Sequence, residues 1–261
     1  MLPPILDVSS FRKTYDRLVA VDDLSFRVDA GQVVGLIGPN GAGKTTTMRA
    51  VAGIIPAARG AIRVHGFDVR DHPVEAKARL AYVPDDPRLF DTLTVWEHMR
   101  FIASAYDVRG WEPDAEALLK RFELVEKRSA TAQELSRGMR QKLAICCAYL
   151  HRPSLVMFDE PMTGLDPHAI RELKESIREQ AGRGTGFLVS SHLLALVEDL
   201  TTHILILHRG ARLFFGSLDQ ARASFAGDDA SLEAVFFRAT ESAARASTGA
   251  PPPPPIGPSA P

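Results

Sequence analysis

Short apolar runs alternate with segments of helical periodicity along most of this chain. Strand-like runs lie at 5–11, 24–28, 33–37, 61–64, 155–158, 187–190 and 204–207. Helical patterns occupy 44–55, 114–127, 138–150, 167–181 and 192–200. Several strand runs are continuously apolar, which is typical of a sheet covered on both faces. The alternation predicts an α/β protein with a mainly parallel sheet.

Three segments depart from this alternation of strands and helices. The interval 87–150 is almost entirely helical, which indicates an inserted helical subdomain. The segment 204–216 predicts a hairpin that turns at Arg209 and Gly210. From 226 to 261 small residues and proline dominate, so we expect the folded domain to span 1–225 and a mostly disordered tail to follow.

Composition narrows the classes of function. The chain has 261 residues and a formal net charge of −1, so it lacks the basic footprint of a nucleic-acid binder. We find no apolar run near the ~20 residues that a membrane span requires. Pro3, Pro4 and Asp7 interrupt the first apolar stretch, which argues against a secretory signal. Any membrane role is therefore expected to come through a partner chain.

The two cysteines, Cys146 and Cys147, are adjacent in a helical pattern. Neighbouring helical side chains point apart, so a disulfide between them is not expected. We predict reduced, buried thiols, which fits a cytosolic protein.

Residues 38–45, GPNGAGKT, match the phosphate-loop pattern of two glycines five apart followed by Lys and Thr. A chance match in a chain of this length is ~1 in 100. An apolar strand precedes the loop and a helical pattern follows it, which is the context the pattern requires. Successive backbone N–H groups then point at phosphate oxygens, Lys44 adds a full charge, and Thr45 offers its hydroxyl to Mg²⁺.

Two carboxylates follow the apolar run 155–158. If the strand continues, Asp159 and Glu160 point to opposite faces and have different tasks. Asp159 is predicted to hold Mg²⁺ through its water shell, and Glu160 to polarise the attacking water. Asn40, the single asparagine, is followed by Gly41, so the guanine-reading pattern Asn-Lys-x-Asp is missing and adenine is favoured.

Further motifs occur in a fixed order. They are LSRGMRQK at 135–142, GLD at 164–166 and SSH at 190–192. With the phosphate loop and the Asp-Glu pair, this order resembles the ATP-binding subunit of an ABC transporter over about residues 5–218. The resemblance implies a P-loop NTPase core with a mainly parallel sheet, an N-terminal antiparallel β subdomain and an inserted helical subdomain.

The resemblance also implies residue roles. Tyr15 stacks on adenine, Glu160 is the catalytic base, and His192 senses the γ-phosphate beside Lys44. Asp166 communicates across a dimer. The phosphate loop comprises Gly38, Pro39, Asn40, Gly41, Ala42, Gly43, Lys44, Thr45 and Thr46.

Ser136 and Gly138 match the signature motif, which closes over ATP held by another subunit. One copy therefore cannot build a complete site, and two must meet head to tail, as a homodimer or a heterodimer. A transmembrane permease is expected to dock around 86–110, where Leu89, Phe90, Leu93, Val95 and Trp96 supply apolar area. The chain would then lie at the cytoplasmic face of the cell membrane.

Two motifs depart from the family pattern. Arg137 and Met139 replace a glycine and a glutamine of the signature, a substitution typical of bacterial exporters of drugs, antibiotics or polysaccharides. Asp85 stands where a glutamine is usual and offers a shorter, charged oxygen ligand to Mg²⁺.

Two other classes of function compete with a transport ATPase. Soluble relatives that act in translation or DNA repair carry two cassettes or long insertions, which this chain lacks. A regulatory module without hydrolysis is disfavoured because Lys44, Asp159, Glu160 and His192 are all present.

Overall fold

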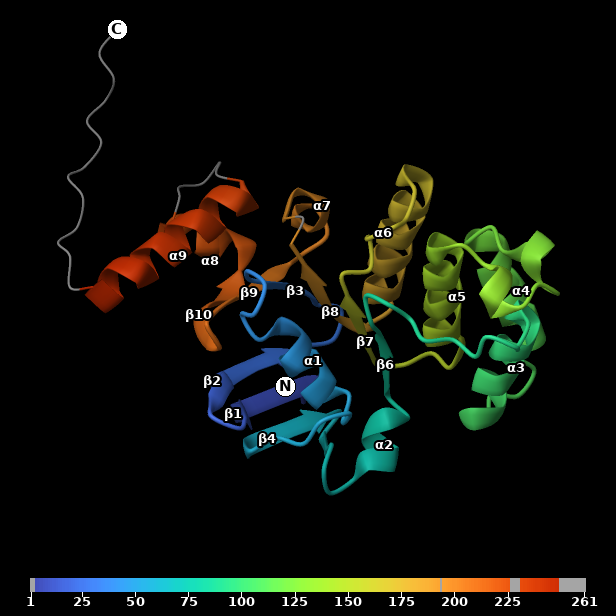
Figure 1. Cartoon of the computed structure of the whole chain (residues 1–261), viewed down its shortest axis with the longest axis horizontal. Helices are drawn as coiled ribbons and strands as arrows, with labels where there is room; N and C mark the ends of the chain where they lie inside the picture. Colours follow the sequence, from blue (N-terminus) through green and yellow to red (C-terminus); the bar gives the residue numbers. More distant parts are fainter. Residues whose placement is uncertain (1–2, 193, 226–230, 249–261) are drawn as a thin grey trace, which may run out of the picture.

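The computed structural model describes residues 3–192, 194–225 and 231–248, which form two sheets with helices around them (Figure 1). The larger sheet has the strand order β10-β9-β3-β8-β7-β6, and its neighbours pair in parallel except for β9 with β10. Its strands are β3 (Val33–Ile37), β6 (Leu80–Val83), β7 (Leu155–Asp159), β8 (Gly186–Ser191), β9 (His203–His208) and β10 (Ala211–Ser217). The prediction of a mainly parallel sheet is confirmed.

The smaller sheet is antiparallel and has the order β2-β1-β4-β5, which confirms the N-terminal β subdomain. Its strands are β1 (Leu6–Tyr15), β2 (Leu18–Val28), β4 (Arg59–Val64) and β5 (Phe67–Asp68). Helix α1 (Lys44–Val51) contacts strands of both sheets.

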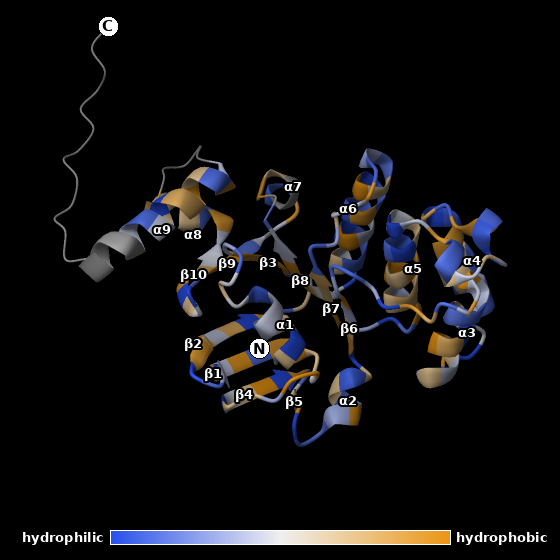
Figure 2. Ribbon diagram, in the orientation of Figure 1, coloured by the Kyte–Doolittle hydropathy of each residue, from blue (hydrophilic) through white to orange (hydrophobic). Residues whose placement is uncertain are grey.

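The core lies on both faces of the larger sheet. Every residue of β3, β7 and β8 is buried, and Figure 2 shows apolar segments along the central strands of this sheet. Along β7 the side chains alternate: Val156 and Phe158 belong to the cluster shared with the helical subdomain, while Leu155 and Met157 face the antiparallel sheet. This double burial explains why the central strands are apolar without a polar alternation.

The helical subdomain lies between β6 and β7 in the chain, within the interval 87–150 in which the sequence predicts it (Figure 1). It consists of α3 (Val95–Ala105), α4 (Glu112–Arg121), the 3-10 turns η1 (Val125–Lys127) and η2 (Ala132–Glu134), and α5 (Arg137–Leu150). The remaining helices of the described residues are α2 (Pro73–Lys77), α6 (Pro167–Gly182), α7 (Leu194–Glu198), α8 (Leu218–Phe225) and α9 (Leu232–Thr248).

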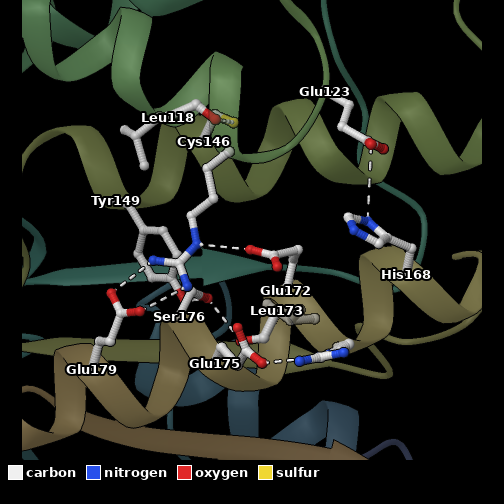
Figure 3. A network of polar contacts seen from close by, with 12 residues as sticks. Leu118, Glu123, Cys146, Tyr149, His168, Glu172, Leu173, Glu175, Ser176 and Glu179 are labelled. Carbon is white, nitrogen blue, oxygen red and sulfur yellow. Dashed lines mark hydrogen bonds and ion pairs between the residues drawn. The ribbon is translucent and has the colours of Figure 1, made fainter.

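Polar side chains join the helical subdomain to α6 (Figure 3). The Arg121 guanidinium donates two hydrogen bonds to Glu179, of 2.8 and 3.1 Å, and pairs with Glu172 at 3.5 Å. The Tyr149 hydroxyl, at the end of α5, lies 3.0 Å from the Ser176 hydroxyl.

The structure corrects several predicted boundaries. The helix predicted over 114–127 ends at Arg121, because Glu123 adopts a left-handed φ of 58°. The helix predicted to reach residue 55 ends at Val51, ahead of Gly53 with φ 63°. Strand β6, which the sequence did not predict, is only four residues long and completes the edge of the sheet. The hairpin is confirmed, with φ of 49° and 80° at Arg209 and Gly210.

The prediction of an irregular chain from 226 onward is wrong over part of its range. Helix α9 spans Leu232–Thr248, and Leu232, Val235 and Ala239 are buried at three- and four-residue spacing. Alanines in this segment favour helix, and its apolar stripe packs against the core. The rest of the predicted tail, 226–230 and 249–261, lies outside the described residues.

Both cysteines are free, as predicted, and burial raises the pKa of both thiols, that of Cys147 to about 12. Over the described part of the chain, every helix is too short or too polar to cross a membrane.

Candidate nucleotide site

A cleft of about 580 Å³ collects most of the predicted site residues at the carboxyl ends of the parallel strands. It lies where the antiparallel sheet meets the phosphate loop. Its lining residues are Tyr15, Leu18, Val19, Ala20, Pro39, Asn40, Gly41, Ala42, Gly43, Lys44, Thr45, Thr46, Asp85, Asp159, Glu160 and Arg209. Segments far apart in the sequence therefore build one site.

The loop between β3 and α1 needs its glycines. A Cβ on Gly38 would lie 2.4 Å from the Leu207 carbonyl oxygen, so no side chain fits there. Gly43 is the N-cap of α1 and has φ 104°, a conformation that L-residues rarely adopt. The N–H groups in the first turn of any helix have no acceptor within that helix, so this turn of α1 offers donors and positive potential to an anion.

Lys44 is held inside the loop. Its Nζ donates to the carbonyl oxygens of Gly38, at 2.7 Å, and Pro39, at 3.4 Å. Burial lowers the pKa of Lys44, and the nearby Glu160 and Asp159 carboxylates oppose that shift. A phosphate in the cleft would be a stronger partner for this buried cation than two neutral carbonyls.

Asp159 is 3% exposed and fixed by two hydroxyl groups. Its carboxylate accepts from Ser190 Oγ at 2.6 Å and from Tyr82 Oη at 3.2 Å. Burial, together with the Asp159 charge, raises the pKa of Tyr82, which keeps that hydroxyl a donor. Sequence reasoning did not identify Tyr82 or Ser190, because each acts across neighbouring strands.

Glu160 differs from the prediction in one respect. Strand β7 ends at Asp159, and Glu160 turns into the left-handed region with φ 52°, so both acids line the same cleft. Its backbone N–H donates to Ser190 Oγ at 3.0 Å, which holds this strained turn. Glu160 Oε2 accepts from the backbone N–H of His192 at 3.2 Å and lies 2.8 Å from His192 Nδ1.

The oxygens present fit a magnesium ion bound together with phosphates. Thr45 and Asp159 offer a hydroxyl and a carboxylate, the hard ligands that Mg²⁺ prefers. No group of three or more His, Cys, Asp or Glu side chains in the described residues could hold a metal by itself. Phosphate oxygens and water would have to complete the coordination shell.

Asp85 also lines the cleft, but its carboxylate has a partner within the chain. Arg137 Nη2 lies 3.2 Å from Asp85 Oδ1. Two of the positions that depart from the family pattern, Asp85 and Arg137, therefore touch each other.

Ser136 and Gly138 do not line this cleft, and neither does His192, which reaches it through Glu160. The Ser136 hydroxyl caps α5 by accepting from the Met139 N–H at 3.3 Å. A Cβ on Gly138 would lie 2.8 Å from the Gly164 carbonyl oxygen, so the start of α5 packs closely on the loop before α6.

Asp166 caps α6 by accepting from the Ala169 N–H at 2.9 Å, a bond that lowers the pKa of its carboxyl group.

Arg209 is a cleft residue that the sequence did not single out. Its hairpin turn is tied to the phosphate loop, since the Gly210 N–H donates to the Ala42 carbonyl at 3.1 Å. The turn was predictable, but its contact with a loop so far away in the chain was not.

A second hollow, of about 640 Å³, lies between the core and the helical subdomain. Leu89 and Phe90 line it, together with the exposed rings of Phe101 and Tyr106. Leu93, Val95 and Trp96, which were predicted to belong to this surface, do not line the hollow: Val95 is buried in the core, and Trp96 is partly buried against it.

Comparisons with known proteins agree with this geometry. The family model described as "ABC transporter" matches residues 21–163. The "ABC-type transporter ATP-binding protein EcsA" of Bacillus subtilis is 35% identical over 91% of this chain and 97% of its own length. The "Nod factor export ATP-binding protein I" of Cupriavidus pinatubonensis is 32% identical over 82% of this chain and 67% of its own.

A solved structure shares the fold over nearly the same range. "Structure of ATP binding subunit of ABC transporter" superimposes with a TM-score of 0.88 at 38% identity. The match covers 90% of this chain and 99% of the solved one.

Proposed function

This chain belongs to the ABC transporter family as an ATP-binding subunit with ATPase activity, and on that premise we propose that two such subunits close head to tail around ATP to power a separate permease. One observation carries the proposal. Lys44, Asp159 and Glu160 line the cleft, while Ser136 is exposed at the start of α5 and outside it. A helix end with no acidic residue in its first turn fits the ATP of a second copy.

The residues of the cleft divide the chemistry among them. The phosphate loop and Lys44 hold the phosphates, and Tyr15 offers an exposed ring at the cleft edge for adenine. Mg²⁺, held by Thr45 and Asp159, would neutralise phosphate charge.

Glu160 carries the hydrolytic role. As a carboxylate at the cleft, it can take a proton from the attacking water. Its contact with His192 fixes the direction of that carboxylate and gives a route by which loss of the γ-phosphate reaches the loop after β8.

The hollow lined by Leu89, Phe90 and Phe101 is the proposed permease contact. Phe90 and Phe101 are 55% and 47% exposed, an unusual setting for two neighbouring rings whose centroids lie 5.2 Å apart. The export named for the Cupriavidus relative and the basic Arg137 in the signature support export as the direction. The subunit would then sit peripherally at the cytoplasmic face of the cell membrane.

The proposal is tested with Glu160→Gln in the full chain. We expect ATP binding to persist, turnover to fall by about 10²- to 10⁴-fold, and ATP with Mg²⁺ to convert the subunit to a dimer in light scattering. Glu116→Gln, which alters an exposed carboxylate paired with Arg128, is the matched control and should behave like the unaltered chain.

Undiminished turnover in Glu160→Gln would contradict the assigned base. A chain that stays monomeric when the Glu160→Gln variant is saturated with ATP would contradict the shared site. Co-purification with a multispanning membrane protein tests the permease partner.

A further inference from the structure

The segment 84–91, between β6 and α3, touches three functional surfaces at once. Asp85 lines the nucleotide cleft, and the following residues up to Phe90 line the hollow assigned to the permease. Two acids of the same segment pair with the start of α5: Asp85 with Arg137 at 3.2 Å and Asp91 with Arg140 at 3.5 Å.

The start of α5 is unusually positive. Its first turn contains no acidic residue, although acids are favoured there and cations are disfavoured by the helix dipole. Arg137 and Arg140 nevertheless occupy this turn, and both of their carboxylate partners come from segment 84–91. The negative charge that the helix end lacks in its own sequence is thus supplied by another element.

Both ion pairs are open to solvent. The side chains of Arg137 and Asp85 are 59% and 50% exposed, and those of Arg140 and Asp91 are 31% and 66% exposed. Exposed pairs of this kind add little to stability. These ion pairs therefore stabilise the fold only weakly, but they can break and form again at little cost in free energy.

Arg137 also lies against the loop before α6. A Cβ built on Gly164 would be 3.5 Å from Arg137 Cδ, so the aliphatic stem of Arg137 runs beside this loop while its guanidinium reaches Asp85. A change of partner at the guanidinium can therefore be made without moving the stem.

We propose that Asp85 and Asp91 form an electrostatic clasp with Arg137 and Arg140 that holds segment 84–91 on α5 in the separate subunit and opens when nucleotide phosphate replaces the carboxylates. This inference deepens the proposed function and rests on it, because the phosphate belongs to ATP in the partner subunit. Asp85 is then a positioning residue that acts through Arg137, in place of the magnesium ligand that the sequence predicted. Opening the clasp frees the segment that also lines the permease hollow.

The two roles of Asp85 make opposite predictions for ATP-driven dimerisation. In the Glu160→Gln background, Asp85→Asn should lower the ATP concentration for half-maximal dimerisation by about two- to fivefold, since exposed pairs are weak. Loss of a magnesium ligand would instead raise that concentration. Asp91→Asn, which alters an acid outside the cleft, should shift it in the same downward direction.

Asp114→Asn is the control for these variants. Asp114 pairs with Arg152 at 2.6 Å elsewhere on the helical subdomain, and its removal should leave the ATP dependence unchanged. The proposal would be overturned if Asp85→Asn raised the ATP concentration for half-maximal dimerisation, or if neither clasp variant changed that concentration.

Hydrogen exchange tests the clasp without relying on dimerisation. In the nucleotide-free subunit, Arg137→Gln and Asp85→Asn should each speed exchange of the amides in 84–91 by about two- to fivefold. The double variant should go no further than either single one, because both remove the same contact.

Unchanged or additive rates in 84–91 would refute the clasp itself. If Glu160→Gln alone fails to dimerise with ATP, the proposed function is refuted, and so is the replacement of the carboxylates by nucleotide phosphate. Hydrogen exchange still decides whether the clasp holds the segment 84–91.

Discussion

The two ends of helix α5 are held in different ways. At its carboxyl end, the 5%-exposed Tyr149 lies 3.0 Å from the Ser176 hydroxyl and packs edge-on against Phe158. At its amino end, Arg137 and Arg140 make single contacts with exposed carboxylates. Helix α5 is therefore held by buried contacts at its carboxyl end and by exposed ion pairs at its amino end.

The charged contact near the buried end strengthens the contrast. Arg121 binds Glu179 through two hydrogen bonds, a geometry that fixes direction as well as distance (Figure 3). The hydrogen bonds that Arg121 donates to Glu179 raise the pKa of Arg121 and lower the pKa of Glu179. The contacts with α6 therefore fix the helical subdomain more firmly than the exposed ion pairs at the start of α5 do.

The largest expected effect comes from breaking the buried end. Tyr149→Ala should lower the free energy of unfolding by about 3–5 kcal/mol, because it removes a buried ring and leaves a cavity. Urea denaturation measures this value. Arg140→Ala, at the other end of the same helix, should cost less than about 1 kcal/mol. Equal losses in the free energy of unfolding for the two variants would show that the two ends of α5 do not differ in this way.

A smaller loss of stability is expected at the contact between Arg121 and Glu179, the charged anchor of the helical subdomain. Arg121→Met should lower the free energy of unfolding by about 1–2 kcal/mol, since it removes a two-point contact with Glu179 and leaves Glu172 without its cation. Arg171→Met is the control, because Arg171 makes one exposed contact with Glu175. The same urea titration should give about 0.5 kcal/mol or less for that variant.

Local patterns predicted the parts of the fold and site that are encoded locally. Continuous apolar runs identified the buried strands, and GPNGAGKT identified the phosphate loop, because both depend on neighbouring residues. Strand β6 was missed because four residues in a short apolar stretch are insufficient to distinguish a strand from a loop. Helix α9 was missed because the proline-rich end dominated the composition around it.

Contacts between segments far apart in the sequence could not be predicted from local patterns. Tyr82 reaches Asp159 over 77 residues, and Arg137 reaches Asp85 over 52. No local pattern indicates either contact, because the partners come from separate segments that only the fold brings together. The left-handed turn at Glu160 was likewise invisible, since a glutamate there gives no signal of positive φ.

Acid should weaken the anchor selectively. The pKa of Glu179 in the folded chain is depressed below its usual value of 4.5, so its stabilising contribution is present above that value and is lost as the pH falls through the folded pKa. The destabilisation by Arg121→Met should therefore shrink between about pH 6 and about pH 3. Urea midpoints of the two chains across this range measure the difference. A gap that widens in acid would contradict the assignment of Glu179 as the partner.

The smallest effect concerns the clasp, and salt provides the test. Raising ionic strength from about 0.1 to 1 M shortens the screening length from about 10 to about 3 Å, which weakens exposed ion pairs more than partly buried ones. The side chains of Arg137 and Asp85 are 59% and 50% exposed, whereas those of Arg121 and Glu172 are each 25% exposed. Amides in 84–91 should therefore exchange about twofold faster at high salt, while the loss of stability in Arg121→Met stays nearly constant. In Arg137→Gln the acceleration by salt should disappear at Asp85 and its neighbours, because the contact that salt weakens has already gone.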